Sequence, residues 1–265
     1  MNGKEKITSE IQALRFHRDR PVEKLIECVA AEKLCQIIVN EKVIATLACS
    51  PANLRELAVG YLISEGIVGE VDSVAEPSQT GDGYEIKVSG RLLVDEDDLA
   101  KRIVTSGCAG GKSLAQIPPG ETAAEPLLGM YVTVSREQLA QLIKEMTKCS
   151  EVFRQTGGVH SAALCTAEKI VFQSDDIGRH NAVDKVIGWA KLNNVDLQDK
   201  LLLSTGRVSA EIVLKAARAQ ITIVASRGAP TSRALDFAQQ LGLTVIGFVR
   251  GERMTVYTWC NRCSD

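Results

Sequence analysis

One cysteine of the chain lies in a sequence context that favours sulfur chemistry. Cys108 stands in the glycine-rich run Ser-Gly-Cys-Ala-Gly-Gly-Lys, residues 106–112, which has neither a helical nor a strand period. Such a run predicts a loop, where a thiol stays accessible. Lys112 and Arg102 are near in sequence, and a positive charge favours the thiolate that nucleophilic sulfur chemistry requires. A lone loop cysteine is nevertheless more often incidental than catalytic.

A second pair of cysteines occurs late in the sequence as Cys260-Asn-Arg-Cys263. The C-x-x-C spacing suits a redox pair or half of a tetrahedral metal site, but no second C-x-x-C supplies the other half. We therefore predict no metal site and interpret the two residues as free thiols on an exposed, frayed tail. Five other cysteines adjoin apolar runs, where a thiol usually packs as a small core residue: Cys28, Cys35, Cys49, Cys149 and Cys165.

Two polar runs combine histidine with glycine. Residues 156–160 read Thr-Gly-Gly-Val-His and connect a predicted helix to a strand, while residues 175–181 read Asp-Asp-Ile-Gly-Arg-His-Asn and lead into the next helix. A histidine titrates near neutrality and can act as acid, base or hydrogen-bond donor to phosphate. The candidate ligand contacts in these runs are Thr156, Gly157, His160, Gly178, Arg179 and His180.

A purely structural interpretation of the same two runs is also open. It makes His160 an interior histidine with satisfied hydrogen bonds, and Asp176 or Asn181 a helix cap. Asp184 and Lys185, a few residues further on, are then expected on a solvated helix face.

Three loops in the second half of the chain pair glycine with arginine. They are Ser204–Arg207, Ser226–Gly228 and Val249–Arg253, and each follows a predicted strand. Glycine lets a backbone approach a ligand closely, arginine offers a two-pronged donor for phosphate, and nearby helix starts add oriented N–H groups. Ligands of open α/β sheets bind outside the carboxyl ends of the strands, so the loops favour a phosphorylated, nucleotide-like ligand. For any single loop, an ordinary surface turn is the simpler explanation.

The elements around these loops alternate between strand and helix. Predicted strands cover residues 162–165, 170–172, 201–203, 221–225, 244–248 and 254–257, and predicted helices cover 181–191, 209–218 and 231–241. This alternation predicts a largely parallel sheet with helices on both faces. Just before it, Tyr131–Val134 predicts a strand, and Ser135 with Gln138 forms a capping box for another helix.

The first half of the chain is expected to fold differently. Residues 1–20 have no clear period and predict a loosely held arm. Residues 37–39 and 43–47 predict a hairpin about Asn40, and residues 84–88 alternate as a half-buried strand. Ser50 is a plausible cap for a helix that Gly66 ends. A domain boundary in residues 118–129 divides an N-terminal α+β domain, residues 1–128, from an α/β domain, residues 129–265.

Composition excludes several classes of protein. Hydrophobic residues make up 45% and charged residues 24% of the 265 residues, which is typical of a folded globular chain rather than a disordered one. The net charge of −2 gives no general attraction to nucleic acid or anionic membranes. No signal-like segment or long apolar run is present, so we expect a cytoplasmic protein with reduced cysteines.

Together these motifs resemble the signature runs of the FdhD family. The most specific of them is Asp-Ile-Gly-Arg-His-Asn-Ala-Val-Asp-Lys, residues 176–185, and other runs in the family order cover residues 156–163, 204–209, 229–231 and 247–253. The resemblance extends more loosely over residues 22–258. It implies a layered α/β domain similar to the cytidine deaminase fold, with a smaller N-terminal α+β domain.

The resemblance also implies an activity. FdhD proteins accept sulfur as a persulfide from a cysteine desulfurase and pass it to the molybdenum cofactor Mo-bis(molybdopterin guanine dinucleotide), which formate dehydrogenase needs. Cys108 corresponds to the persulfide cysteine, and family members are usually homodimers without a permanent cofactor. The segment matching the contact with the guanine dinucleotide arms comprises Phe248, Val249, Arg250, Gly251, Glu252 and Arg253, and Ser204 and Arg207 are predicted to adjoin it.

One departure from the family keeps an alternative open. Many members carry C-x-x-C in the loop, whereas this chain has Gly111 at the second cysteine position. A transferable persulfide needs only one thiol, so the predicted role of Cys108 holds, but a chaperone that binds the cofactor without carrying sulfur is the rival. A zinc deaminase is disfavoured, because its H-x-E and P-C-x-x-C signatures are missing: Ser161 and Ala162 follow His160, and Trp259 precedes Cys260.

Overall fold

The structure, a computed structural model, describes residues 7–94, 124, 126–127, 129 and 132–265. Cys108 and its loop lie outside these described residues, as does most of the predicted boundary at residues 118–129. The division into two domains therefore stays a prediction. The described part is a mixed α/β fold, which confirms the predicted fold class.

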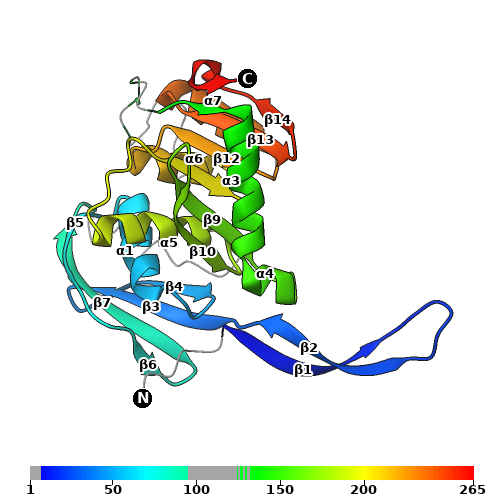
Figure 1. Ribbon diagram of the computed structural model, residues 1–265. Coiled ribbons are helices and arrows are strands. Elements are labelled where there is room, and N and C mark those ends of the chain that lie inside the picture. Colours follow the sequence, from blue (N-terminus) through cyan, green and yellow to red (C-terminus); the bar gives the residue numbers. More distant parts are fainter. Residues whose placement is uncertain (1–6, 95–123, 125, 128, 130–131) are drawn as a thin grey trace.

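The larger sheet lies in the second half of the chain and has six strands (Figure 1). Its order is β10-β9-β11-β12-β13-β14. The strands are β9 (His160–Cys165), β10 (Ile170–Asp176), β11 (Leu201–Ser204), β12 (Ile223–Ser226), β13 (Thr244–Arg250) and β14 (Arg253–Val256). Only β11 with β12 and β12 with β13 pair in parallel, so the prediction of a largely parallel sheet is wrong. Short turns join β9 to β10 and β13 to β14, and a short turn can connect only antiparallel neighbours.

Helices cover both faces of this sheet, as predicted. Alternate strand residues, among them Leu164, Leu202 and Val224, share a core with α5 (Arg179–Leu192), α6 (Ala210–Arg218) and α7 (Ser232–Leu241). The residues between them, such as Ala163 and Leu203, pack against α3 (Arg136–Cys149) on the opposite face. Because successive side chains of a strand point to opposite faces, the central strands β9, β11 and β12 are buried on both sides of the sheet.

The smaller sheet has the order β4-β3-β7-β5, with β6 added against β7. Its strands are β3 (Lys33–Val39), β4 (Lys42–Cys49), β5 (Val68–Val74), β6 (Ser78–Thr80) and β7 (Gly83–Leu92). The predicted hairpin between β3 and β4 is confirmed. Asn40 and Glu41 have φ of 47° and 70°, the left-handed conformation that suits a tight two-residue hairpin turn. The buried side of the sheet packs against α1 (Leu54–Ser64).

Helix α1 starts later than predicted. Its N-cap is Asn53, and Ser50 is not a helix cap but a buried contact to the second half of the chain. The Ser50 amide donates to Asp176 Oδ2 at 3.1 Å, and its hydroxyl accepts from the amide of Ile177 at 3.2 Å. The predicted end is confirmed: the helix stops at Ser64, just before Gly66 with φ 66°.

Two glycines allow α1 and α5 to touch along their backbones. A Cβ on Gly60 would lie 1.8 Å from the carbonyl oxygen of Asp184, and one on Gly188 would lie 1.9 Å from that of Glu56. Real side chains never approach backbone atoms so closely, so only glycine fits at either position. Helix α1 is consequently held between the smaller sheet and α5.

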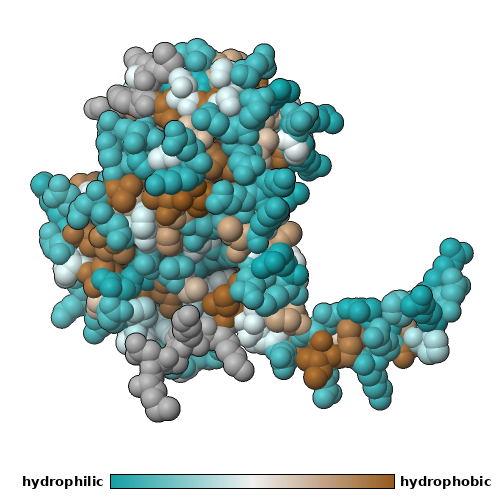
Figure 2. Space-filling view, viewed as in Figure 1, coloured by the Kyte–Doolittle hydropathy of each residue, from teal (hydrophilic) through white to brown (hydrophobic). Residues whose placement is uncertain are grey.

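Residues 8–15 of the predicted N-terminal arm form a strand, although the sequence there has no clear period. Strand β1 (Thr8–Arg15) pairs with β2 (Glu23–Ala30) as a two-stranded ribbon that projects away from the rest of the molecule (Figure 1). Figure 2 shows apolar residues along this arm among hydrophilic ones. The exposed apolar side chains of the arm are Ile11, Leu14, Phe16, Val22, Ile26 and Val29.

The region around α3 is partly as predicted. The capping box of Ser135 and Gln138 is confirmed, and α4 (Glu151–Thr156) follows α3 directly. In place of the predicted strand 131–134, the described residues form the two-residue strand β8 (Val134–Ser135). Its partner is β15 (Cys263–Ser264), so the segment predicted as a frayed tail is instead paired into the structure. None of the helices in the described part is both long and apolar enough to cross a membrane.

Candidate functional site

Most of the predicted ligand contacts of the described chain lie at one edge of the six-stranded sheet. Strands β10, β11, β12 and β13 end there, whereas β9 and β14 begin there. Helices α5, α6 and α7 start directly after β10, β11 and β12, so their N-terminal N–H groups are near the same edge. We call residues 156–160, 176–180, 204–209, 226–231 and 247–253 the strand-end edge.

The loops after β11 and β12 are hydrogen-bonded to each other. The Ser226 hydroxyl lies 2.9 Å from the carbonyl oxygen of Ser204 and 2.5 Å from that of Gly206. The amide of Gly228 donates back to the Ser226 hydroxyl at 2.9 Å. A Cβ on Gly228 would lie 2.6 Å from the Gly206 carbonyl oxygen, so glycine is required for the two backbones to approach this closely. The amide of Phe248 donates to the Gly228 carbonyl at 3.0 Å and joins the loop after β13 to the same network.

His160 lies beside the loop after β11. Its Nδ1 is 3.3 Å from Thr205 Oγ1, which also accepts the amide of Ser161 at 3.0 Å. Burial, and then the charge of Arg179, lowers the pKa of His160 below its ordinary value. The half-buried imidazole is therefore neutral at pH 7 and can donate a hydrogen bond without carrying charge. Thr205 was not among the predicted contacts, because its partner is distant in sequence.

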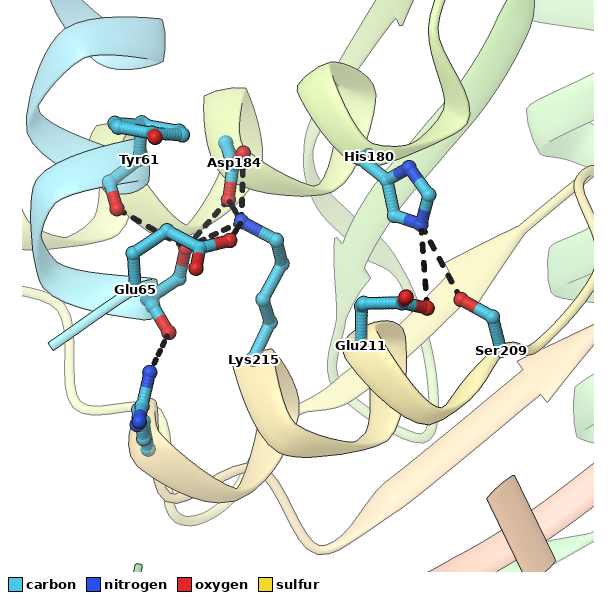
Figure 3. Close-up of polar contacts among 9 residues, drawn as sticks. Tyr61, Glu65, His180, Asp184, Ser209, Glu211 and Lys215 are labelled. Carbon is cyan, nitrogen blue, oxygen red and sulfur yellow. Dashed lines mark hydrogen bonds and ion pairs between the residues drawn. The ribbon is translucent and has the colours of Figure 1, made fainter. Parts of the chain in front are cut away.

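Arg179 and His180 form the first turn of α5. Arg179 packs on the loop after β11, since a Cβ added to Gly206 would lie 2.7 Å from the Cβ of Arg179. His180 Nε2 is 3.2 Å from Ser209 Oγ and 4.0 Å from Glu211 Oε2 (Figure 3). Burial lowers the pKa of His180 to about 4, and the charges of Arg179 and Lys215 add to that effect. His180 is thus a neutral, internally bonded histidine rather than a cationic phosphate contact.

The segment 248–253 divides into two parts. Phe248, with φ 53°, lies against Gly228 at the strand ends, and the Arg250 guanidinium carbon stands 5.8 Å from the centre of its ring. Gly251, with φ 59°, forms the turn into β14. Glu252 completes the turn and Arg253 begins β14, and both line a separate pocket with α3 and the C-terminal segment. Only the first part of the segment therefore contacts the other glycine loops.

Thr156 and Gly157 stand at the margin of the strand-end edge. The Thr156 hydroxyl donates to the Val152 carbonyl at 2.8 Å and accepts from the Gly158 amide at 3.0 Å. Gly157, with φ 63°, ends α4, and Val159 then leads into β9. These residues fix the turn before His160. Arg207 and Arg250 are exposed at the edge, while Gly178 donates its amide to Asp176 Oδ1 at 2.8 Å, so Asp176 braces the start of α5.

Asp184 and Lys185 are buried, so the prediction of a solvated helix face is wrong for both. Lys185 Nζ lies 2.7 Å from Asp176 Oδ2 and donates to the Ser50 carbonyl at 3.0 Å, with both charged side chains fully buried. Asn181 donates to Asp176 and to the Ala48 carbonyl, each at 2.9 Å. This cluster ties the end of β4 to the start of α5, and its partners come from sequence positions over a hundred residues apart.

A second buried ion pair joins three helices (Figure 3). Lys215 of α6 lies 2.8 and 2.9 Å from the two carboxylate oxygens of Asp184 in α5, and 2.8 Å from the carboxylate of Glu65 after α1. Ser64 donates to Asp184 at 2.6 Å. Burial raises the pKa of Asp184 to about 6, which still leaves it mostly ionised at pH 7. Burial disfavours the Lys215 ammonium, but Asp184 and Glu65 outweigh this and raise its pKa.

The strand-end edge has the chemistry of an anion site. It combines exposed arginines, three helix starts and glycine loops that a larger residue would obstruct. Within the described ranges, no group of three or more His, Cys, Asp or Glu side chains is placed to hold a metal ion. The arrangement suits a ligand with phosphate groups.

Comparisons with known proteins agree with the signature runs. The family model described as the FdhD/NarQ family matches residues 30–264. A curated relative from Bacillus pumilus (strain SAFR-032), named sulfur carrier protein FdhD, is 37% identical over 235 residues, which cover 86% of this chain and 87% of the relative. The protein of the same name from Bacillus subtilis (strain 168) is 35% identical over 264 residues, covering 98% and 99%.

A solved structure shares the fold. It is a crystal structure described as that of a formate dehydrogenase accessory protein from Desulfotalea psychrophila, with a TM-score of 0.77 and 24% sequence identity. The match covers 97% of this chain and all of the solved chain. With the family model spanning most of the sequence, the chain belongs to the FdhD/NarQ family.

Proposed function

We propose that this protein is a sulfur carrier that serves the assembly of a molybdenum enzyme. The observation that carries the proposal is the match to the FdhD/NarQ family over residues 30–264, together with relatives named sulfur carrier proteins at 35–37% identity. The family resemblance adds two parts to this proposal. The enzyme served is formate dehydrogenase, and the sulfur is delivered to the molybdenum of Mo-bis(molybdopterin guanine dinucleotide).

The proposed sulfur-bearing residue is Cys108. Its thiolate attacks the terminal sulfur of a desulfurase persulfide, so that the sulfane sulfur moves to Cys108 and the desulfurase cysteine leaves as a thiolate. In the second step the S–S bond of the Cys108 persulfide would break and Cys108 would leave as a thiolate, while the sulfane sulfur would become a sulfide ligand of the client molybdenum, which would supply the two electrons. This role rests on the family motif, because the loop lies outside the described residues.

The strand-end edge is the proposed binding surface for the guanine dinucleotide arms. Arg207 and Arg250 are exposed there and can pair with phosphate oxygens, while Gly206 and Gly228 let the backbone lie close to the ligand. His160 is neutral at pH 7 and serves as a hydrogen-bond donor or acceptor. His180, already bonded to Ser209, positions the α5 and α6 starts rather than meeting the ligand.

We propose a homodimer that acts in the cytoplasm with a cysteine desulfurase and formate dehydrogenase as partners. The N-terminal arm supports association, since a two-stranded ribbon is marginally stable alone and this one exposes Phe16 at 75% and Ile26 at 66% of their surfaces. Light scattering of the purified chain tests the dimer directly.

The rival function is a chaperone that binds the cofactor without carrying sulfur. The substitution Cys108→Ala distinguishes the two functions in a strain that lacks its own sulfur carrier. We expect the variant to abolish formate dehydrogenase activity while guanosine diphosphate still binds. The matched control is Cys149→Ala, which removes a thiol that is exposed in the described part of the chain and should leave activity unchanged. Normal activity of the Cys108 variant would favour the chaperone.

A further inference from the structure

The C-terminal C-x-x-C lies in a hydrogen-bonded turn. Cys260–Arg262 form the 3₁₀ turn η2, and the amide of Cys263 donates to the Cys260 carbonyl. Such an i to i+3 bond brings the two α-carbons within about 7 Å, and residues three apart lie above one another in a 3₁₀ turn. Disulfides span α-carbon separations of about 4.4 to 6.8 Å, so the backbone is already close to the geometry of a bridge.

Buried contacts hold the turn in place. The side chain of Arg262 is 1% exposed, and its guanidinium donates to the carbonyls of Gly242, Leu127 and Gly129 at 2.6, 2.9 and 2.8 Å. The Trp259 indole donates to the Gln239 carbonyl at 3.1 Å. Because these bonds order the segment, bridging the two cysteines would not have to immobilise a flexible tail.

The two thiols differ in exposure. Cys260 is exposed, whereas Cys263 is half-buried in β15 and packs against the core behind α3. Burial, and then the neighbouring Cys260, raises the pKa of Cys263 to about 11. The more accessible Cys260 is therefore the better placed of the two thiols to meet a substrate first, and the half-buried Cys263 the better placed to react second.

A pocket of about 390 Å³ opens beside both cysteines. Arg136, Glu252 and Arg253 supply polar groups to its wall, and Leu139 and Met254 supply apolar ones. The pocket is large enough for a small organic molecule attached to sulfur. It shares Glu252 and Arg253 with the turn at the strand-end edge, but it opens toward α3 rather than toward the glycine loops.

We propose that Cys260 and Cys263 form a reversible redox dithiol whose substrate is a small disulfide bound in this pocket. The Cys260 thiolate attacks one substrate sulfur, which forms a mixed disulfide and releases one thiolate. Cys263 then loses its proton to solvent and attacks the Cys260 sulfur, which closes the internal disulfide and releases the second thiolate. Two protein thiols are oxidised and one substrate disulfide is reduced to two thiols, which take up two protons. A dithiol reductant reverses the sequence.

The proposal is tested on the full chain in buffers of oxidised and reduced glutathione, followed by alkylation and mass spectrometry. In the wild-type chain the peptide with residues 260–263 should lose two hydrogens and resist alkylation. The disulfide should form at a ratio of oxidised to reduced glutathione at least about tenfold lower than the ratio at which Cys149 forms its glutathione adduct, since the second thiol is held nearby. Cys149 is a matched exposed thiol, and its behaviour should not change in any of the variants.

Two substitutions assign the roles. In Cys263→Ala the glutathione adduct of Cys260 should accumulate, and in Cys260→Ala Cys263 should stay reduced under the same buffer. Far-ultraviolet circular dichroism checks that both variants fold. A stable glutathione adduct on wild-type Cys260, or oxidation of Cys263 without Cys260, would overturn the proposal. The proposal would also be overturned if Cys260 and Cys263 stayed reduced in every buffer in which Cys149 stays reduced.

Discussion

The signature run 176–185 supplies two regions that use charge in opposite ways. Its first part, with Arg179 and His180, belongs to the strand-end edge. Asp184, near the end of the run, lies inside the helix junction, which we define as the contact of α1, α5 and α6 around Gly60, Gly188, Asp184 and Lys215. At the edge, Arg207 is exposed and open to a ligand, whereas the junction charges Asp184 and Lys215 are buried and paired with each other.

The difference shows how a single helix can serve two purposes. Helix α5 starts at the edge and runs inward, so residues one or two turns apart experience solvent and core respectively. A buried charge must be paired and hydrogen-bonded, whereas an exposed charge contributes little to stability. Substitutions in the junction should therefore change stability, and substitutions at the edge should change binding.

The glycine contact of the junction should be the most sensitive point. Gly188→Ala places a Cβ where the Glu56 carbonyl lies, so α1 and α5 must separate, and we expect a loss of more than about 4 kcal/mol. Urea unfolding of the purified variant measures this. Gly69→Ala is the control, since the nearest atoms to its Cβ would be Leu93 side-chain atoms at 3.4 to 3.6 Å, and it should cost less than about 1 kcal/mol. A Gly188 variant as stable as this control would contradict the close helix contact.

The buried ion pair should come next. Asp184→Asn leaves Lys215 with Glu65 as its remaining carboxylate partner, and we expect a loss of about 3 kcal/mol in the free energy of unfolding. The exposed pair of Arg55 and Glu76 serves as comparison, and Glu76→Ala should cost under about 1 kcal/mol. Equal losses in the two variants would show that burial does not distinguish the junction.

His180 should make stability depend on pH. Its pKa falls from 6.5 to about 4 on folding, so between these values the unfolded chain binds more protons and stability is lost as pH decreases. Asp184 acts oppositely, because a pKa raised to about 6 lets the folded chain hold the proton more tightly. The difference in the free energy of unfolding between wild type and His180→Gln isolates the contribution of the histidine. This difference should shrink by up to about 3 kcal/mol from pH 7 to pH 4. A difference independent of pH would mean that His180 is not shielded in the folded protein.

The exposed arginines should affect stability least. Arg207→Ala and Arg250→Ala should each change the free energy of unfolding by less than about 0.5 kcal/mol but weaken binding of guanosine diphosphate about tenfold. Calorimetric titration measures the affinity, with Arg91→Ala as a control for an exposed arginine on the smaller sheet. Unchanged affinity in both variants would remove the edge as the nucleotide-binding surface.

Sequence predicts the part of this fold that local patterns determine. The Asn40 hairpin and the Ser135 capping box follow from residues within a few positions of each other, so both are confirmed. The gathering of the glycine loops was predictable as well, because each follows a strand that ends at the same edge.

Contacts between distant residues account for what the sequence did not reveal. Ser50 reads as a helix cap until Asp176, 126 positions away, is placed beside it. The sequence around Lys215 does not indicate that its partner is Asp184. The C-terminal segment has no local pattern that predicts its order, which comes from the bonds of Arg262 to carbonyls more than a hundred residues earlier. Local spacing has no information about such pairs.

The most direct test of the proposed sulfur carrier is mass spectrometry of the full chain after incubation with a cysteine desulfurase and cysteine. We predict that the peptide containing Cys108 gains one sulfur atom and that a reducing agent removes this atom. The Cys108→Ala variant should gain no sulfur on any other cysteine. A chain that acquires no sulfur, or acquires it on Cys149 or Cys260 while Cys108 stays unmodified, would contradict the role proposed for Cys108.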